Sequence, residues 1–572
     1  MALLAQIDVP RADILSSIVR SERTGVMTSP LFTALPDEFN AASYFVDRHI
    51  LEGRGQNIAM ECGELRVTYQ ELFETVNRVG NCLRTLGTRV EERILLALFD
   101  TPEFAASFFG AIKIGAVPVP VNTLLKPSDY EYLLNDSRAR IAIVSEGLMP
   151  LLKAISREHL RFLQHILVVG TETWAGTHNF GRALSESSAV LDAMATTKDD
   201  AAFWLYSSGS TGRPKACVHL QHDMVVSSEA YAKGILNIKE SDRCFSVSKL
   251  FFAYGLGNGL YFPLSVGATS ILLPGPPRPD TVFEVIERYR PTLFFSVPSN
   301  YARLLAHTRQ DGRDFDVSSI RWGVSAGEAL PAIIFHRFQE RFGVQILDAL
   351  GSTEALHMVI ANRPGHVRPG SSGQLIPGFE ARIVNDHNRQ LAAGEIGNLI
   401  VKADSVCACY WNQHAKTKDT IEGHWIRTGD KYYQDDEGYF WYAGRSDDML
   451  KISGVWVSPI EIENALLEHV AVQEAAVVAR PDQLQLPRTV ACVVVGEGFQ
   501  PTASLARELQ AFVGGRLGNS KRPHQIEFHT ELPKTATGSC SALGFVRRVK
   551  IRTPTEPHST TDEERHSGRS VS

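Results

Sequence analysis

The chain is 572 residues long, with 44% hydrophobic and 21% charged residues and a formal net charge of −6. This composition is ordinary for a soluble folded protein, and a chain of this length needs more than one hydrophobic core, so we expect several subdomains. No segment is dominated by basic residues, which argues against nucleic acid as a partner.

The eight cysteines are scattered, and none belongs to a C-x-x-C pair. That spacing indicates neither a disulfide framework nor a zinc framework, and it favours a reducing compartment. No stretch approaches the roughly 20 apolar residues of a membrane span, and the apolar run from Met1 to Ile7 is too short for a secretory signal. We therefore expect a soluble, cytoplasmic protein without a membrane span.

Strands alternate with helices after an N-terminal extension over residues 1–38. The spacing of apolar residues predicts a helix over Thr68–Leu86 with Thr68 as its N-cap, a strand over Arg93–Phe99 and a helix over Pro102–Ile114. Further strands are predicted at 116–121, 141–144, 201–205, 269–273, 293–297, 320–325 and 345–349, and further helices at 281–289, 298–307 and 332–342. The alternation predicts an α/β fold with mostly parallel sheets covered by helices.

The last third of the chain has a different pattern. Between Gly373 and Asp430, glycines and prolines separate short strands, which is typical of a small antiparallel β subdomain. From Lys451 onward, a helix at 459–468 and strands at 475–479 and 490–495 predict a smaller α+β unit. We divide the chain into the extension 1–38, a large domain 39–446, a small domain 447–551 and a polar tail 552–572, predicted to be disordered.

A loop rich in glycine and hydroxyl groups, Tyr206–Lys215, follows the apolar strand Ala201–Leu205. Glycines let backbone N–H groups approach anionic oxygens, hydroxyls add donors, and a lysine adds a mobile positive charge. The loop therefore predicts a phosphate site, with a solvated turn as the alternative. Its contributing residues are Ser207, Ser208, Gly209, Ser210, Thr211, Gly212 and Lys215. It is not the nucleoside-triphosphatase loop, because a proline precedes the lysine.

Four shorter motifs follow in order: Gly351–Glu354, Arg427–Asp430, Gly444–Asp448 and Lys451–Gly454. Each alone has an ordinary alternative, with Glu354 as a helix-starting acid, Asp430 as a turn residue, and Arg445 with Asp447 as a surface ion pair. Together with the loop, they resemble the adenylate-forming enzymes, the superfamily of acyl-CoA synthetases, peptide-synthetase adenylation domains and luciferases. The resemblance covers Phe39 to Gly538.

Three stretches narrow the resemblance to the benzoate-CoA and 2-aminobenzoate-CoA ligases: Phe39–Asp47, Lys249–Asn258 and Ser325–Pro331. This resemblance implies a two-step reaction. A benzoate-type carboxylate attacks the α-phosphate of ATP with loss of pyrophosphate, and the thiol of CoA then displaces AMP from the aroyl-adenylate.

The resemblance also implies roles for individual residues. Thr211 and Lys215 would hold the β- and γ-phosphates, Ser352 and Thr353 would lie at the α-phosphate, and Glu354 would bind Mg²⁺, a cation that takes carboxylate and phosphate oxygens. Asp430 and Arg445 are implied at the ribose and Gly327 and Glu328 at adenine, while Phe252, Ala253, Tyr254, Gly327 and His357 are implied in the aryl-acid pocket. His357 is equally well explained as an ordinary packed histidine.

The family's smaller domain rotates between the two steps about the residue that matches Asp447. The segment from Lys451 to Gly454 would then line the tunnel for CoA. A carrier-protein phosphopantetheine is the alternative acceptor, because both acceptors present the same arm. The sequence leaves open whether the protein forms a homodimer.

Two positions depart from the family pattern. Ala216 stands where a glycine is usual, which strains the loop only if that position needs a positive φ. Ser539 follows Pro533–Gly538 at the position of the family's last lysine, which reaches the carboxylate and the α-phosphate during adenylation. Losing such a donor costs about 3–4 kcal/mol of transition-state stabilisation.

The residues after Ser539 also differ from the family's basic ending, so we hypothesise a frameshift there, natural or from a sequencing error. We expect an aryl-CoA ligase with weakened adenylation. A non-catalytic ligand-binding relative is the alternative from a different functional class.

Overall fold

The computed structural model divides into two compact units, Met1–Met449 and Leu450–Ser572, called here the large unit and the small unit. It describes residues 35–172, 174–207, 213–445, 450–452, 455–481, 487–496, 498–518 and 521–532. The predictions for most of the N-terminal extension, for Ser208–Gly212, Asp447, Gly454 and Ser539, and for the tail lie outside these residues.

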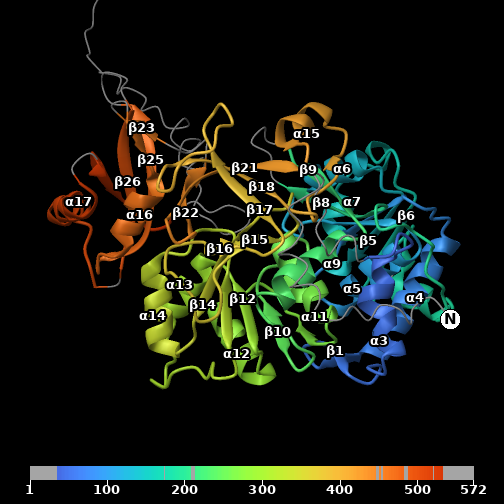
Figure 1. The fold of residues 1–572 in the computed structure, drawn as a ribbon. Coiled ribbons are helices and arrows are strands. Elements are labelled where there is room, and N and C mark those ends of the chain that lie inside the picture. The colour runs from blue at the N-terminus through green and yellow to red at the C-terminus, as the bar shows by residue number, and fades with distance from the viewer. Residues whose placement is uncertain are drawn as a thin grey trace, which may run out of the picture. The chain divides into compact units, whose positions relative to one another are not determined.

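A nine-stranded sheet forms the centre of the large unit (Figure 1). Its order is β16-β15-β14-β13-β12-β10-β11-β1-β2, and every neighbouring pair from β14 to β1 is parallel, whereas β2, β15 and β16 pair antiparallel at the edges. The strands are β1 (Ile58–Cys62), β2 (Leu65–Thr68), β10 (Arg243–Ser246), β11 (Thr269–Ile271), β12 (Leu293–Ser296), β13 (Trp322–Ser325), β14 (Ile346–Gly351), β15 (Met358–Ala361) and β16 (Gln374–Leu375). The predicted mostly parallel α/β fold is confirmed.

A second sheet is wholly parallel, with the order β4-β3-β5-β6-β7. Its strands are β3 (Arg93–Ala97), β4 (Val117–Pro120), β5 (Ile141–Ser145), β6 (His165–Val169) and β7 (His178–Asn179). Strands β3 and β5 are buried almost throughout, as expected for a parallel sheet covered on both faces.

The predicted phosphate loop connects two antiparallel strands, β8 (Ala201–Ser207) and β9 (Lys215–Leu220), with β19 (Cys409–Tyr410) on the other edge of β9. The prediction placed Tyr206, Ser207 and Lys215 in the loop, and this was wrong. Ser207 pairs with Lys215 as the last rung of the β8–β9 ladder, so backbone pairing between the strands overrides the local preference of Ser207 for a turn.

The predicted β subdomain is an antiparallel sheet of five strands. It comprises β17 (Glu380–Val384), β18 (Gly397–Lys402), β20 (Ile421–Glu422), β21 (Trp425–Gln434) and β22 (Phe440–Arg445). The sheet therefore extends beyond the predicted end at Asp430, because the turn after Gln434 returns the chain as β22.

The helices of the large unit agree closely with the predicted ranges. α4 (Tyr69–Thr85) begins after Thr68 with a complete capping box, since the Thr68 hydroxyl accepts from the Glu71 N–H and the Glu71 carboxylate accepts from the Thr68 N–H. α5 (Pro102–Lys113), α12 (Pro279–Tyr289), α13 (Pro298–Ala306) and α14 (Ala332–Phe342) match predicted helices. Figure 1 shows α12, α13 and α14 beside the strands of the nine-stranded sheet.

The other described helices of the large unit are short, except for the 11-residue α6. The α-helices are α3 (Arg48–Leu51), α6 (Pro127–Ser137), α7 (Met149–Lys153), α8 (Phe180–Ser185), α9 (Asp223–Ser227), α10 (Ala253–Leu256), α11 (Phe262–Leu264) and α15 (His414–Thr420). Five further turns are of π or 3₁₀ type: η2 (Ser43–Asp47), η3 (Glu146–Leu148), η4 (Arg157–His159), η5 (Ser228–Lys233) and η6 (Gly257–Tyr261). In the described part of the chain, no helix has the length and apolar character needed to cross a bilayer.

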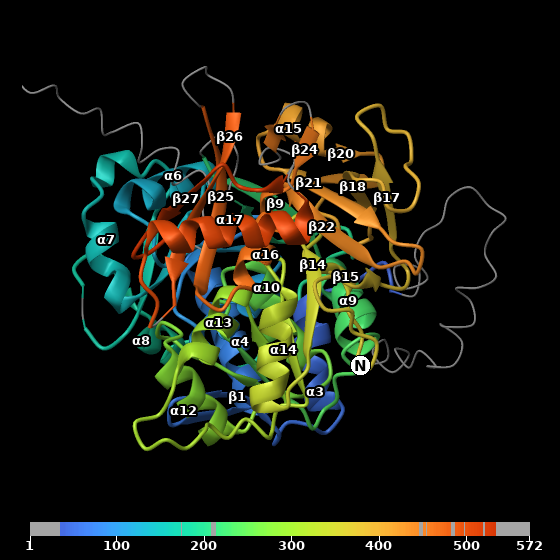
Figure 2. The same ribbon diagram turned by 90° about the vertical axis from the view of Figure 1, so that its left-hand side faces the viewer.

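The small unit has a three-stranded sheet, β25 (Val472–Pro481), β26 (Pro487–Val495) and β27 (Gln525–Phe528), and a two-stranded ribbon, β23 (Leu450–Ile452) and β24 (Val455–Val457). Helices α16 (Pro459–Leu467) and α17 (Ala503–Leu517) lie against one face of the three-stranded sheet (Figure 2). Their apolar residues pack on alternate residues of β25 and β26, including Val477 and Val493. The predicted α+β character is confirmed.

The capping box of α4 gives a prediction for local stability. Replacing Thr68 with Ala removes the acceptor for the Glu71 amide, so opening of the first turn should cost about 1 kcal/mol less and its amides should exchange roughly fivefold faster. Hydrogen exchange read by mass spectrometry measures this. Thr75→Ala, on the same helix with its hydroxyl on the Glu71 carbonyl, is the control and should not speed exchange. Equal rates in Thr68→Ala and the native chain would contradict the assigned cap.

Candidate active site

Two predicted motifs lie at the carboxyl ends of neighbouring parallel strands, where ligands of such sheets bind. Ser325–Glu328 begins at the end of β13, and Gly351–Glu354 begins at the end of β14. Gly327 has a φ of +86°, so this turn needs the left-handed conformation that glycine adopts without strain. The predicted adenine residues and the predicted phosphate and magnesium residues thus leave adjacent strands at the same edge of the sheet.

The carboxylate of Glu354 is the centre of a cluster of polar side chains from three segments of the chain. Its Oε1 atom lies 3.1 Å from Lys215 Nζ and accepts hydrogen bonds from Tyr410 Oη at 2.7 Å and Ser207 Oγ at 3.2 Å. Lys215 Nζ also donates to Tyr410 Oη at 2.7 Å and lies 4.0 Å from the centre of the Tyr410 ring. Strands β8, β9 and β19 and the turn after β14 therefore meet at one oxygen atom.

The electrostatics of this cluster favour an ionised Glu354 and a protonated Tyr410. Burial opposes ionisation of Glu354, but the charge of Lys215 and the Tyr410 hydrogen bond outweigh it and lower the pKa of Glu354 below its ordinary value. Burial, together with the Glu354 carboxylate, raises the pKa of Tyr410 far above that of a free tyrosine. The carboxylate is thus a permanent anion next to a cation.

Hydrogen bonds hold the backbone of the Glu354 turn on both sides. The Thr353 carbonyl lies 2.9 Å from Nε2 of the buried His219, whose Nδ1 lies 2.8 Å from Asp223 Oδ2. The Glu354 carbonyl accepts from the Cys407 N–H at 2.7 Å. The position of the carboxylate is therefore fixed by partners from β9 and from the segment before β19.

Leu356 has a φ of +67° although it is not a glycine, and its side chain is fully buried. A residue held in this region costs about 1–3 kcal/mol of backbone strain and persists only where the surrounding structure enforces it. This turn reverses the chain between Glu354 and His357, so the strained conformation separates the polar cluster from the aromatic residues beyond it.

His357 lies among four aromatic rings, those of Tyr231, Tyr254, Tyr261 and Phe262, with ring centres 4.4–6.3 Å away. Its Nε2 lies 3.3 Å from the Tyr254 carbonyl, and its Nδ1 has no hydrogen-bond partner. Burial lowers the pKa of His357 to about 3, so the imidazole is neutral. The packed-histidine interpretation therefore describes its surroundings, and Tyr254 is the one of these four ring residues that was also predicted for the aryl-acid pocket.

The turn that carries Phe252, Ala253 and Tyr254 is held by an ion pair. Asp100 Oδ2 lies 3.5 Å from Lys249 Nζ, and Asp100 Oδ1 accepts from the Leu250 N–H at 3.1 Å. Lys249 Nζ also donates to the carbonyls of Leu273 and Gly275. Burial, opposed by Lys249, raises the pKa of Asp100 to about 6. The carboxylate and the lysine together fix the start of this turn.

The two residues predicted at the ribose are cross-strand neighbours. Asp430 on β21 pairs with Arg445 on β22, and Arg445 Nη1 donates to Asp430 Oδ1 at 2.9 Å. Burial raises the pKa of Asp430 despite the opposing charge of Arg445. Gly429 has a φ of +78°, and a Cβ there would lie 3.2 Å from the Arg445 guanidinium. The glycine thus leaves room for the arginine beside the carboxylate.

Ala216 lies inside β9, opposite Tyr206, and its carbonyl accepts from the Trp411 N–H at 2.9 Å. It is absent from the residues with positive φ in the described chain. Position 216 does not need a positive φ, so the alanine does not strain the loop.

Sequence reasoning missed Tyr410, His219, Asp100 and Lys249 as residues that position the site. Tyr410 is 195 residues from Lys215 and 56 from Glu354, and only the pairing of β19 with β9 brings it to them. The one available signal was the place of Asp100 directly after the predicted strand Arg93–Phe99, three residues beyond the end of β3.

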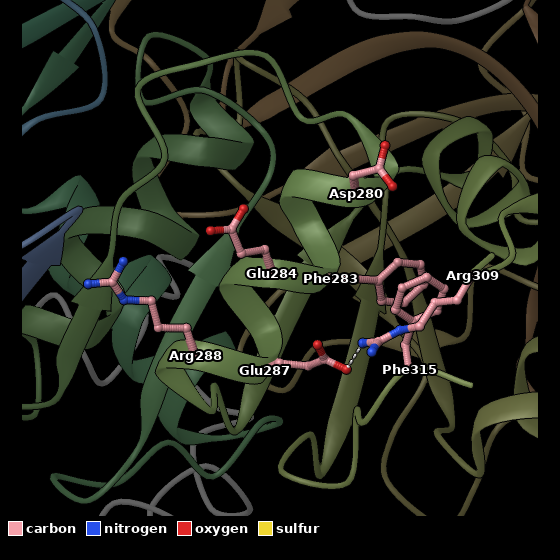
Figure 3. Close-up of a pocket in the computed structure, with 7 residues that line it drawn as sticks. All are labelled: Asp280, Phe283, Glu284, Glu287, Arg288, Arg309 and Phe315. Carbon is pink, nitrogen blue, oxygen red and sulfur yellow. Dashed lines mark hydrogen bonds and ion pairs between the residues drawn. The ribbon is translucent and has the colours of Figure 1, made fainter. Parts of the chain in front are cut away.

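A separate hollow of about 490 Å³ lies on the surface beside α12 (Figure 3). It is lined by Asp280, Phe283, Glu284, Glu287, Arg288, Arg309 and Phe315. None of these is a predicted site residue. Figure 3 shows Arg309 paired with Glu287 across it, so much of its charge is neutralised within the hollow.

Comparison with known proteins agrees with this geometry. Residues 47–411 match the AMP-binding enzyme family, and residues 461–539 match the AMP-binding enzyme C-terminal domain. The chain is 45% identical to a benzoate–CoA ligase of Thauera aromatica, over 92% of this chain and 98% of that protein.

Solved structures are also similar. An anthranilate CoA ligase, AuaEII, in complex with anthranoyl-AMP has a TM-score of 0.87 and 40% identity, covering 91% of this chain and 99% of that one. A benzoate CoA ligase from Burkholderia xenovorans LB400 has a TM-score of 0.81 and 42% identity, covering 90% and 100%. The resemblance inferred from the motifs is confirmed, and the chain belongs to the AMP-binding, adenylate-forming enzymes, in the group that includes the benzoate-CoA and anthranilate-CoA ligases.

Proposed function

We propose that this protein is an ATP-dependent aryl-CoA ligase that converts a benzoate-type acid, ATP and CoA into an aroyl-CoA, AMP and pyrophosphate through an aroyl-adenylate. The observation that supports the proposal is the short stretch of chain between Glu354, on the proposed phosphate-binding side, and His357, on the proposed aryl-acid side. Glu354, in the turn after β14, pairs with Lys215 at the start of β9, and His357, three residues after Glu354, lies among aromatic rings that we propose as part of the aryl-acid pocket. An acid bound against that pocket would present its carboxylate toward the phosphate-binding side.

In the adenylation step, catalysis consists mainly of positioning and charge stabilisation. Lys215, with Thr211 in the loop, would hold the β- and γ-phosphates, while Ser352 and Thr353 would lie at the α-phosphate. The ionised Glu354 has the hard oxygen donor that Mg²⁺ prefers, so it fits the implied metal. When bound, Mg²⁺ would neutralise charge on the phosphate oxygens.

Without nucleotide, Lys215 and Glu354 neutralise one another. When Mg²⁺ and the triphosphate bind, Lys215 would pair with phosphate oxygens and Glu354 would pair with the cation instead of with each other. Tyr410 contacts both groups through one hydroxyl. We propose that it holds the two side chains in place while they exchange partners.

The aryl pocket offers a neutral, aromatic lining. His357 is uncharged, and the Tyr254 hydroxyl donates to the Ser296 and Val324 carbonyls. Such a lining favours a flat ring without a charged substituent, which fits benzoate or an aminobenzoate. Gly327, Phe252 and Ala253 complete the proposed lining.

The second step is a thiol transfer. CoA would reach the adenylate when the small unit pivots at Asp447 and brings Lys451 and Gly454 to the tunnel. A carrier-protein phosphopantetheine is the alternative acceptor. With free ATP and CoA as substrates, we place the reaction in the cytoplasm, and a dimer is not needed for any step.

Because Ser539 stands at the position of the family's lysine, we expect the adenylation step to be slow. Its lysine counterpart acts in adenylation and has no task in the thiol transfer, so the two half-reactions should differ. Purified protein should convert synthetic benzoyl-adenylate and CoA to benzoyl-CoA, while adenylate formation from ATP and benzoate should be slow. Ser539→Lys should accelerate adenylation by about 10²–10³-fold. Pyrophosphate exchange measures the first step, and chromatography of the thioester measures the second.

The same assays separate the alternatives. Failure to form thioester from preformed adenylate, with either CoA or a phosphopantetheinylated carrier protein, would favour a ligand-binding role and contradict the proposed function. Ser539→Ala is the matched control and should leave adenylation slow. A panel of benzoate, 2-aminobenzoate and 4-hydroxybenzoate in the Ser539→Lys background identifies the preferred acid.

Tyr410→Phe tests the proposed role of the hydroxyl at Lys215 and Glu354. Losing a hydrogen bond to a charged group costs about 1.5–3 kcal/mol, so adenylation in the Ser539→Lys background should slow by roughly 10–100-fold and need more Mg²⁺. Thioester formation from benzoyl-adenylate should not change. Tyr130→Phe, a buried tyrosine whose hydroxyl donates to the Asn122 carbonyl, is the control. An equal slowing of both half-reactions would instead indicate a general structural defect.

Asp100 gives a pH prediction. Its pKa of about 6 means that the carboxylate is ionised at neutral pH and loses its ion pair with Lys249 as the pH falls through about 6. This folded-state pKa lies above the ordinary value, so protonation of Asp100 does not itself destabilise the fold. The dissociation constant for benzoate, measured by calorimetry, should therefore rise several-fold below pH 6. Asp100→Asn should bind weakly at all pH values, and a steep acid-side rise retained in this variant would exclude Asp100 as its origin.

A further inference from the structure

Three side chains with metal-binding atoms meet on the three-stranded sheet of the small unit, and none of them belongs to a motif described above. They are Cys492, Glu527 and His529, whose candidate ligand atoms all lie within 4.8 Å of one another. Among the described residues, no other group of this kind was found.

The register of the sheet produces this cluster. Cys492 on β26 is the direct parallel partner of Glu527 on β27. His529 continues the same pairing, because its N–H donates to the Val493 carbonyl at 2.9 Å. Residues two apart on a strand project from the same face, so Glu527 and His529 project together on the side of Cys492.

The cluster lies on the face of the sheet opposite α16 and α17. Cys492 belongs to a small apolar group with Ala476, Val478, Val490 and Val494, separate from the core that the helices cover. The residue opposite Cys492 on β25 is Ala476, and Leu532 completes the buried apolar group around the thiol. Cys492 is fully buried, whereas the side chains of Glu527 and His529 are 25% and 31% exposed. The thiol therefore lies in the apolar interior of the site, and the carboxylate and the imidazole lie partly in solvent.

The spacing of His529 and Glu527 suits a tetrahedral cation, and the Cys492 sulfur lies within 4.8 Å of both. Zn²⁺ binds thiolate at about 2.3 Å and imidazole or carboxylate at about 2.0–2.2 Å, so its ligand atoms lie roughly 3.3–3.8 Å apart. His529 Nε2 already lies 3.6 Å from Glu527 Oε2. The other carboxylate oxygen, Oε1, accepts from Arg480 Nη1 at 2.6 Å and from Gln525 Nε2 at 3.1 Å. These partners turn Oε2 toward the histidine, as outer hydrogen bonds do for carboxylate ligands of metals.

We propose that Cys492, Glu527 and His529 form a Zn²⁺ site on the small unit. A soft thiolate combined with an imidazole and one carboxylate oxygen selects a borderline cation such as Zn²⁺ over Mg²⁺ or Ca²⁺. On binding, the Cys492 S–H bond breaks, its proton leaves to solvent, and an S–Zn bond forms. Three protein ligands leave the fourth position to water.

The site is independent of the proposed reaction. All three ligands belong to the small unit, none is a predicted residue of the aryl-CoA ligase, and the Mg²⁺ implied at Glu354 has a different donor set. Zn²⁺ here would tie β26 to β27 through side chains.

Cobalt titration of the full-length, reduced and chelator-stripped protein tests the proposal. We expect one Co²⁺ per chain, a thiolate-to-cobalt charge-transfer band in the near ultraviolet, and displacement of that band by Zn²⁺. Cys492→Ser should lose the band, and Glu527→Gln and His529→Gln should each weaken Co²⁺ binding by at least about tenfold. Cys82→Ala, in α4, and His524→Gln, next to β27, are matched controls that should keep the band and the affinity.

Two results would overturn the site: absence of the band at saturating Co²⁺, or its persistence in Cys492→Ser. If circular dichroism shows that Cys492→Ser does not fold, the variants Glu527→Gln and His529→Gln provide the test. Unchanged affinity in both Glu527→Gln and His529→Gln contradicts the proposal, and a tenfold or larger loss in each, with His524→Gln unaffected, supports it.

Discussion

The arrangement of the candidate active site depends on one buried carboxylate, that of Glu354. A buried ion is unfavourable unless a counter-ion and hydrogen bonds satisfy it, and here Lys215, Tyr410 and Ser207 all converge on the same oxygen. Removing one partner of such a pair leaves an uncompensated charge, at a typical cost of about 3–5 kcal/mol. The carboxylate therefore fixes the relative positions of β8, β9, β19 and the turn after β14. These elements are distant in sequence.

The buried carboxylate of Glu354 explains how the proposed phosphate-binding residues and the proposed aryl-acid residues keep fixed positions relative to each other. The turn at Glu354 is held through its carbonyls by His219 and Cys407, and the strained Leu356 then directs the chain to His357. The Asp100–Lys249 pair fixes the opposite wall, which carries Tyr254. Tyr254 and His357, both predicted for the aryl-acid pocket, thus lie on two turns that are each anchored by a buried carboxylate. Positioning of this quality is what an adenylation reaction requires of the protein.

Sequence reasoning succeeded where a local pattern determines the structure and failed where pairing between distant segments does. The helices α4 and α14 were predicted closely, because capping residues and apolar spacing define them locally. The end of β8 was misplaced, because Ser207 and Lys215 look like turn residues and become strand residues only by pairing with each other. Lys215 was predicted as a phosphate ligand from the loop pattern, and Glu354 was predicted as a Mg²⁺ ligand through the family resemblance. Tyr410 and the cluster of Cys492, Glu527 and His529 could not be predicted, because the pairing of strands alone creates their contacts.

Ser539 removes the positive charge of the lysine that the family has at this position. Lys215 and Glu354, which we propose for the pyrophosphate side of the reaction, belong to the large unit and are supported by partners within it. The cation that would face the carboxylate under attack comes, in the family pattern, from the small unit. Its loss leaves no buried partner unpaired among the described residues of the Glu354 cluster, since that cluster is neutralised internally. Under the proposed function, we therefore expect a substitution at 539 to leave the Glu354 cluster intact and to affect the half-reaction in which negative charge builds up between the acid and the α-phosphate.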